Sequence, residues 1–191
     1  MIYLASQSPR RKELLAQLDV EFEVIAASID ETPFSNEAPR EYVERMAAEK
    51  ALAGAKKVND ADIVLGSDTI VVSNNRILGK PTDFADFKRM MSLLSNSTHQ
   101  VMTAVAICTD ANVRCEVVQS DVTFKALSED EITRYWQTNE PCDKAGGYGI
   151  QGIAGKFIMR LNGSYSAVVG LPLYETDTLL KQVIADKVNE K

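Results

Sequence analysis

Asp68 is the first residue to consider for chemistry, because its carboxylate interrupts a strongly apolar stretch. The surrounding sequence is Ile63-Val64-Leu65-Gly66-Ser67-Asp68-Thr69-Ile70-Val71-Val72. A carboxylate embedded there loses hydration unless a cation or a hydrogen-bond donor compensates it. It could bind a divalent metal, orient a water molecule or accept its proton, although purely structural aspartates also occur in such places. The small Gly66 and Ser67 favour space for a ligand.

A second candidate is the segment Ala5-Ser6-Gln7-Ser8-Pro9-Arg10-Arg11, which joins an expected strand to an expected helix. The first turn of a helix offers unpaired backbone N–H groups and the positive end of the helix dipole to an anion. Arg10 and Arg11 are unfavourable there by about a few tenths of a kcal/mol each. Their placement therefore indicates a polyphosphate at the helix start, with two solvated arginines as the alternative. Ser8 could donate to phosphate or simply cap the helix.

Three further charged residues could join these groups. Glu31 could supply a second carboxylate, although a solvated loop charge is the simpler interpretation. Lys50 lies on the apolar face of an expected helix, where snorkelling to water is the commoner behaviour and pointing into a cleft is the alternative. Lys80 ends an expected strand and could meet a phosphate near Asp68. Gly79-Lys80-Pro81 is not a Walker loop, because the chain lacks the Gly-x-x-x-x-Gly-Lys-Ser/Thr pattern.

The segment from Asp143 to Gly152 combines glycines with an aromatic ring and an amide. Five of the chain's 10 glycines fall between Gly146 and Gly155. Such a run needs unusual backbone angles or a close approach of a ligand, and it suits a nucleotide base or sugar. Tyr148, Ile150 and Ile153 alternate as in a half-buried strand, which argues against a flexible linker.

Composition excludes several classes of protein. Lys plus Arg is 21 against 27 for Asp plus Glu, and this net charge of −6 does not favour a nucleic-acid-binding surface. No apolar run approaches the ~20 residues that span a bilayer, and no signal-peptide pattern is present, so we expect a cytosolic protein. Cys108, Cys115 and Cys142 show no CxxC spacing and are expected to be small buried apolar groups. His99, the single histidine, argues against a multi-histidine zinc site.

Strand and helix patterns alternate along the chain, which predicts one α/β domain over residues 1–191. Helix starts are expected at Ser8, near Pro39, at Asp83 and at the capping box of Ser128 and Glu131. The residues 157–169 are expected to form a hairpin that turns at Asn162-Gly163. A last helix follows Pro172.

Five segments together resemble the Maf family of nucleotide pyrophosphatases. They are Ala5-Ser6-Gln7-Ser8-Pro9-Arg10-Arg11, Gly66-Ser67-Asp68-Thr69, Gly79-Lys80-Pro81, Thr98-His99-Gln100-Val101 and Asp143-Lys144-Ala145-Gly146-Gly147-Tyr148-Gly149-Ile150-Gln151-Gly152. Each segment alone is weak or moderate evidence, but five in the family's order are specific and span most of the chain. Arg11, Thr69 and Gln151 match the positions that this family associates with selectivity for dTTP and UTP.

The resemblance implies an inosine-triphosphatase-like α/β fold, with a long bent mixed sheet flanked by helices and a cleft between two lobes. It also implies a cytoplasmic homodimer that requires a divalent metal, Mg²⁺ or Mn²⁺. The implied reaction is attack of water on the α-phosphorus of dTTP or UTP, or of a modified pyrimidine nucleotide. The products are a nucleoside monophosphate and pyrophosphate.

The resemblance also implies roles for single residues. Asp68 is the proton acceptor, and Glu31 and Asp68 bind the metal. The triphosphate is bound by Ser8, Arg10, Arg11, Lys50 and Lys80, while base selectivity falls to Arg11, Thr69 and Gln151. The alternatives are a non-catalytic nucleotide or nucleic-acid sensor and a pyrophosphatase for altered purine nucleotides. Metal-dependent turnover of UTP distinguishes a pyrophosphatase from a sensor that only binds nucleotide. Preferred turnover of inosine triphosphate distinguishes a pyrophosphatase for altered purine nucleotides from one for dTTP and UTP.

Overall fold

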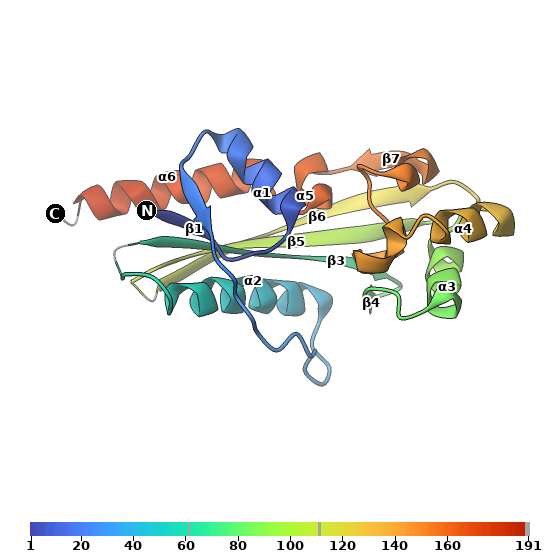
Figure 1. Ribbon diagram of the computed structural model, residues 1–191, viewed down its shortest axis with the longest axis horizontal. Helices are drawn as coiled ribbons and strands as arrows, with labels where there is room; N and C mark the ends of the chain where they lie inside the picture. Colours follow the sequence, from blue (N-terminus) through green and yellow to red (C-terminus); the bar gives the residue numbers. More distant parts are fainter. Residues whose placement is uncertain (61, 111, 190–191) are drawn as a thin grey trace. The chain divides into compact units, whose positions relative to one another are not determined.

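The computed structural model describes residues 1–60, 62–110 and 112–189, which form a mixed α/β structure (Figure 1). The described chain contains a seven-stranded sheet with the strand order β2-β1-β3-β5-β6-β7, and β4 pairs with β3 off this path. The expected mixed sheet flanked by helices is therefore confirmed. Within the described residues, no helix is long and apolar enough to cross a bilayer.

The chain divides into two compact units, which are best described separately. The first unit consists of Met1–Asp68, Thr103–Val118 and Gly170–Lys191, and the second of Thr69–Met102 and Gln119–Val169. Three strands pass from one unit into the other: β3 (Ile63–Ser73), β5 (Thr98–Thr109) and β6 (Asn112–Phe124).

Parallel strands organise the first unit. β1 (Ile2–Leu4) pairs with β2 (Phe22–Val24) on one side and with β3 on the other, so that Leu4 lies opposite both Val24 and Leu65. Backbone bonds from Ala5 N to Leu65 O (2.8 Å) and from Ile25 N to Leu4 O (3.0 Å) extend the pairing. Because the three strands are parallel, the segments that follow β1 and β2 leave the sheet at the same edge, where β3 continues beyond Leu65.

Helices cover both sides of these strands. The helices of the first unit are α1 (Pro9–Leu15), continued by the 3-10 helix η1 (Ala16–Leu18), α2 (Pro39–Ala55) and α6 (Leu173–Asn189). Figure 1 shows α2 and α6 on opposite sides of the strands of this unit. α2 packs tightly on β3, because a Cβ added at Gly66 would lie 2.3 Å from the carbonyl oxygen of Ala47. Glycine at position 66 therefore permits this close approach.

The second unit has an aromatic core. Its elements are β4 (Arg76–Leu78), α3 (Phe84–Leu94), α4 (Glu129–Trp136), η2 (Glu140–Asp143), η3 (Ala145–Gly147), η4 (Ile153–Phe157), β7 (Ile158–Asn162) and α5 (Tyr165–Val169). Phe87, Phe124, Tyr135 and Phe157 are each at most 2% exposed. The expected helix starts at Asp83 and Ser128 are confirmed, since each side chain accepts a backbone N–H at the start of its helix.

Two expectations for the second unit are wrong. The hairpin over residues 157–169 stops after its first strand, because residues 165–169 form the helix α5. Ser164 Oγ accepts a hydrogen bond from Ala167 N (3.3 Å), as a helix cap does. The alternation of Tyr148, Ile150 and Ile153 does not form a strand either: Tyr148 follows the 3-10 helix η3, Ile150 lies in a turn and Ile153 begins the 3-10 helix η4.

The cysteine prediction is correct for one residue of three. Cys108 is buried, Cys115 is half-buried and Cys142 is exposed, and none of the three forms a disulfide among the described residues. Burial raises the pKa of Cys115 to about 12, so this thiol is unreactive at neutral pH.

Candidate active site

Three of the residues predicted for chemistry in the first unit lie at or beyond the carboxyl ends of the paired parallel strands. Ser8 follows β1, Glu31 follows β2 and Asp68 lies in β3 beyond Leu65, the last residue paired with β1. Open α/β sheets bind ligands at this edge, because the loops that leave the strands converge there. The topology therefore accounts for the proximity of residues that are far apart in the sequence.

Lys50 joins the two predicted carboxylates. Its Nζ lies 2.7 Å from Asp68 Oδ1 and 2.8 Å from Glu31 Oε1. The side chains of Lys50 and Asp68 are only 12% and 14% exposed, whereas that of Glu31 is 57% exposed. The snorkelling expected for Lys50 is therefore wrong, and Asp68 has a cationic partner. The tight packing of α2 at Gly66 brings the turn of Lys50 next to Asp68.

The loop that carries Glu31 is held by two side chains from α2. Tyr42 Oη donates a hydrogen bond to the carbonyl oxygen of Glu31 (2.9 Å), and Arg45 Nη2 donates to that of Thr32 (3.1 Å). Burial, followed by the negative charges of Asp68 and Glu31, raises the pKa of Tyr42 to about 12. This tyrosine therefore remains a neutral hydrogen-bond donor at neutral pH.

Arg11 makes structural contacts as well as facing the acidic residues. Its Nε donates to the carbonyl oxygen of Gly170 (2.9 Å) and its Nη1 to Ser6 Oγ (3.4 Å). Burial lowers the pKa of Arg11, and the charges of Asp68 and Glu31 act in the opposite direction. Arg11, Asp68 and Glu31 thus belong to one electrostatic cluster. The interpretation of Arg11 as a purely solvated arginine is wrong.

Ser8 acts as the helix cap that the sequence predicts. Its Oγ accepts a long hydrogen bond from Arg11 N (3.5 Å), and its backbone N–H donates to Ser6 Oγ (3.2 Å). Arg10 is half-buried and lowers the pKa of Arg11 by charge repulsion. The structure therefore places Ser8 and Arg10 beside Arg11, and their roles toward phosphate stay predictions.

The remaining predicted residues lie in the second unit. Thr69 is half-buried and follows Asp68 directly in β3, while Lys80 and Gln151 are exposed. The Lys80 segment and the glycine-rich segment are tied together, because Gly146 N donates to the carbonyl oxygen of Gly79 (2.9 Å). A Cβ at Gly146 would lie 2.8 Å from Val71, so the segment packs tightly at this point. It is a compact turn structure and not a linker.

His99 is a buried neutral residue. It is 2% exposed, and its Nε2 lies 2.6 Å from the hydroxyl of Tyr148 in the glycine-rich segment. Burial lowers the pKa of His99 to about 4. Its Nδ1 has no hydrogen-bond partner among the residues that the structure describes. His99 therefore anchors Tyr148, and no carboxylate among the described residues is hydrogen-bonded to its ring to make it a base.

Sequence reasoning missed Tyr42, Arg45 and Gly170. The two side chains of α2 donate hydrogen bonds to backbone carbonyl oxygens of the Glu31 loop. Every residue type has such a carbonyl group, so the sequence of the loop does not indicate these contacts. Gly170 also acts through its carbonyl oxygen, which accepts from Ser67 Oγ (3.2 Å) as well as from Arg11. A bulky polar side chain on the buried face of a helix was the one available signal for Tyr42.

The donor set of the first unit fits a hard divalent cation. Mg²⁺ is commonly held by one or two carboxylates together with waters and substrate phosphates. The two carboxylates are close together, because Lys50 Nζ contacts Asp68 Oδ1 and Glu31 Oε1. Within the described residues there is no cluster of three or more His, Cys, Asp or Glu side chains suited to a metal. A site completed by substrate phosphates is therefore the arrangement that these residues match.

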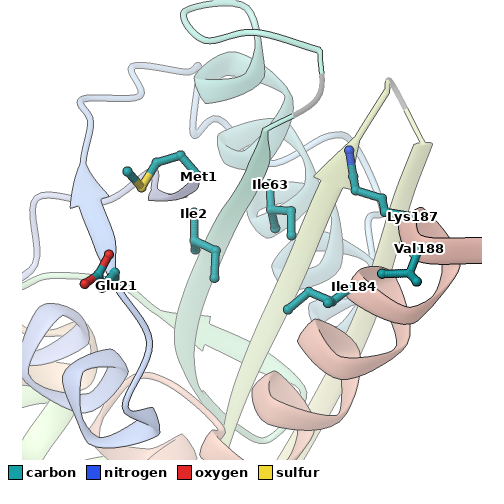
Figure 2. Close-up of a pocket in the computed structure, with 7 residues that line it drawn as sticks. All are labelled: Met1, Ile2, Glu21, Ile63, Ile184, Lys187 and Val188. Atoms are coloured by element: carbon teal, nitrogen blue, oxygen red, sulfur yellow. The ribbon is translucent and has the colours of Figure 1, made fainter. Parts of the chain in front are cut away.

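A pocket in the first unit lies elsewhere. Figure 2 shows Ile2 and Ile63 on neighbouring strands, facing Ile184 and Val188 of α6. Its full lining is Met1, Ile2, Glu21, Ile63, Ile184, Lys187 and Val188. Ile2 and Ile63 are the first residues of β1 and β3, so this pocket is at the amino ends of the strands. It contains none of the residues predicted for catalysis or binding.

Fold and site together define an α/β protein with a mixed carboxylate and cation cluster at the carboxyl ends of parallel strands. The sequence model of one family, described as Maf-like protein, matches residues 1–183. The chain belongs to the Maf family.

Known proteins of high similarity carry a common name. A dTTP/UTP pyrophosphatase of Vibrio cholerae is 56% identical over 179 residues, which cover 94% of this chain and 96% of that protein. A dTTP/UTP pyrophosphatase of Vibrio vulnificus is 53% identical over 183 residues, covering 96% and 98%. Among solved structures, a nucleoside-triphosphatase (dITP/XTP pyrophosphatase) of Mycobacterium abscessus is 16% identical with a TM-score of 0.47, covering 98% and 96%.

Proposed function

We propose that this protein is a nucleoside triphosphate pyrophosphatase that hydrolyses dTTP and UTP, and modified pyrimidine nucleotides of similar shape. Water attacks the α-phosphorus, and the nucleoside monophosphate and pyrophosphate leave. The observation that carries the proposal is the ammonium of Lys50 set between the carboxylates of Asp68 and Glu31, in a chain that is more than half identical to proteins named for this activity.

We assign a separate role in this reaction to each of the predicted residues. Asp68 accepts a proton from the attacking water, while Lys50 fixes the direction of its carboxylate. Ser8, Arg10 and Arg11, with Lys80 of the second unit, offset the negative charge of the triphosphate and the leaving pyrophosphate. Thr69 and Gln151, with Arg11, select the base and sugar.

Asp68 and Glu31 would hold a divalent cation, Mg²⁺ or Mn²⁺. When bound, such a cation supplies positive charge to phosphoryl oxygens and lowers the pKa of a coordinated water. Isothermal titration of Mn²⁺ into the protein with a non-hydrolysable UTP analogue tests the ligand set. Glu31→Gln should weaken the binding of Mn²⁺, and unchanged binding removes Glu31 from the metal site.

Turnover measurements test the proposed reaction. Pyrophosphate release should be measured for UTP, dTTP, CTP, ATP, GTP and inosine triphosphate with and without Mg²⁺. UTP and dTTP should give the highest kcat/KM. Nucleotide binding without turnover across several divalent metals would establish the sensor alternative. Preference for inosine triphosphate would establish the altered-purine alternative.

We also propose, on the resemblance alone, that the chain acts as one domain and forms a cytoplasmic homodimer. Sedimentation equilibrium should give twice the chain mass of 21.0 kDa. Calorimetry should give one cooperative unfolding transition, whereas two separate transitions contradict the single domain. Cell fractionation tests the location.

A further inference from the structure

The turn that carries Gln151 is held by a carboxylate from a neighbouring 3-10 helix. Glu140 Oε2 accepts a hydrogen bond from the backbone N–H of Ile153 (3.0 Å), two residues after Gln151. Gly152 N donates to the carbonyl oxygen of Gly149 (3.1 Å), which closes the turn on its other side. The exposed Gln151 therefore projects from a backbone segment with a fixed anchor.

Glu140 lies directly against this backbone. A Cβ added at Gly152 would lie 2.2 Å from Glu140 Oε1, so a side chain at position 152 would have to displace this carboxylate. The carboxylate and the turn are thus matched in shape as well as by the hydrogen bond. Any larger residue at position 152 would push the carboxylate away from Ile153.

Glu140 is itself fixed from two sides. Tyr135 of α4 is 2% exposed, and its hydroxyl donates to Glu140 Oε1 (2.8 Å). Lys144 Nζ donates to the carbonyl oxygen of Glu140 (2.8 Å), which holds the backbone of this residue. Burial and the hydrogen bond to Glu140 raise the pKa of Tyr135, so its hydroxyl stays protonated and keeps donating. Two hydrogen bonds of the Glu140 carboxylate therefore connect Tyr135 of the aromatic core with the turn that carries Gln151.

We propose that Glu140, oriented by Tyr135, is a positioning residue that sets base selectivity through the Gln151 turn. The proposal rests on the proposed function, in which Gln151 meets the base. Uracil presents an N3–H donor beside the O4 acceptor, and cytosine presents the reverse, so a glutamine amide matches either base depending on which way it faces. A backbone held in one place fixes the point from which the Gln151 side chain starts, so that the groups around the base can hold its amide in the uracil orientation.

Selectivity measurements with three variants test this role. Tyr135→Phe removes one hydroxyl, Glu140→Gln keeps the shape and one acceptor oxygen, and Glu140→Ala removes the anchor. We expect the ratio of kcat/KM for UTP to that for CTP to fall by about tenfold in Glu140→Ala, mainly through KM for UTP. The UTP-to-CTP ratio of kcat/KM in Tyr135→Phe and in Glu140→Gln should lie between that of Glu140→Ala and that of the wild type. Gln151→Ala serves as the positive control for lost selectivity.

The outcomes separate the inference from the function on which it rests. Absence of pyrophosphate release by the wild type contradicts the proposed function. Normal release, with a lower melting temperature but an unchanged UTP-to-CTP ratio in all three variants, shows a purely structural Glu140 and overturns the inference. Amide hydrogen exchange supplies a readout apart from activity, because Ile153 N–H should exchange faster in Glu140→Ala while the amides of α3 keep their rates. Unchanged protection of Ile153 also overturns the inference.

Discussion

The carbonyl oxygen of Gly170 accepts a hydrogen bond from Arg11 Nε, across 159 residues of sequence. The same oxygen accepts from Ser67 Oγ, next to Asp68. Arg11 therefore connects the segment before α6 with the acidic cluster, and its loss should affect both stability and activity.

Arg11→Ala should lower the free energy of unfolding by about 1 to 3 kcal/mol, because the carbonyl oxygen of Gly170 loses a charged donor. Its kcat/KM for UTP should fall as well. Arg11→Lys keeps the charge but cannot reproduce the planar donor geometry, so it should recover activity only in part. Urea unfolding and steady-state kinetics check both effects. Wild-type stability in Arg11→Ala would show that the Gly170 contact contributes nothing.

Asp68→Asn should lower kcat by about 10²- to 10⁴-fold, because the amide cannot accept the proton from water. The free energy of unfolding should fall by only about 1 to 3 kcal/mol, since Glu31 stays beside Lys50. Asp177→Asn is a matched control, because it removes a carboxylate that pairs with Lys181 on the surface of α6. This control should keep wild-type kinetics. Asp68→Asn with activity within a few fold of wild type would exclude Asp68 from the chemistry.

His99 should make the native state lose stability in acid. Its pKa is lowered to about 4 in the folded chain from 6.5, so between these pH values the unfolded chain binds one proton more. Stability from this group is complete above pH 6.5 and falls by about 3 kcal/mol as the pH decreases to 4. His99→Gln removes the titration and should flatten this part of the curve. NMR titration of the single histidine provides the direct measurement, and a midpoint near 6.5 contradicts the buried neutral state.

Gly146→Ala should destabilise the protein by about 1 to 3 kcal/mol, because φ is +67° and the new Cβ would press on Val71. Gly79→Ala is the matched control on the partner segment. A Cβ at Gly79 meets nothing within 4 Å, so this variant should lie within about 0.5 kcal/mol of wild type. Thermal melting of both proteins gives the comparison, and equal melting temperatures contradict the strained position.

The parts of the fold and site that the sequence could predict depend on local signals. Ser8, Asp83 and Ser128 are helix caps that act within three residues, and all three are confirmed. The strand expected over 164–169 fails because the cap at Ser164, and the contact of its backbone N–H with Ser120 Oγ (3.0 Å), outweigh the β propensity of Tyr165 and two valines. The Ser120 contact joins residues 44 positions apart, which no local pattern reveals.

In the candidate site, too, the sequence predicts what local signals determine and misses what distant contacts determine. Asp68 stands out because its own neighbours in the sequence are apolar, and the structure provides the cation that such a carboxylate requires. The snorkelling expected for Lys50 fails because both its partners are distant in sequence, at Glu31 and Asp68. Glu140 gave no sequence signal, since its partners are a hydroxyl from α4 and a backbone amide.

The unequal burial of the three cysteines makes the natural chain suitable for selective labelling. Cys142 is exposed, whereas Cys108 is buried and the raised pKa of Cys115 suppresses its thiolate. A maleimide fluorophore should therefore attach at position 142 without prior mutagenesis. That position is two residues from Glu140, so a change in the fluorescence on addition of nucleotide would show whether the surroundings of this 3-10 helix respond to binding.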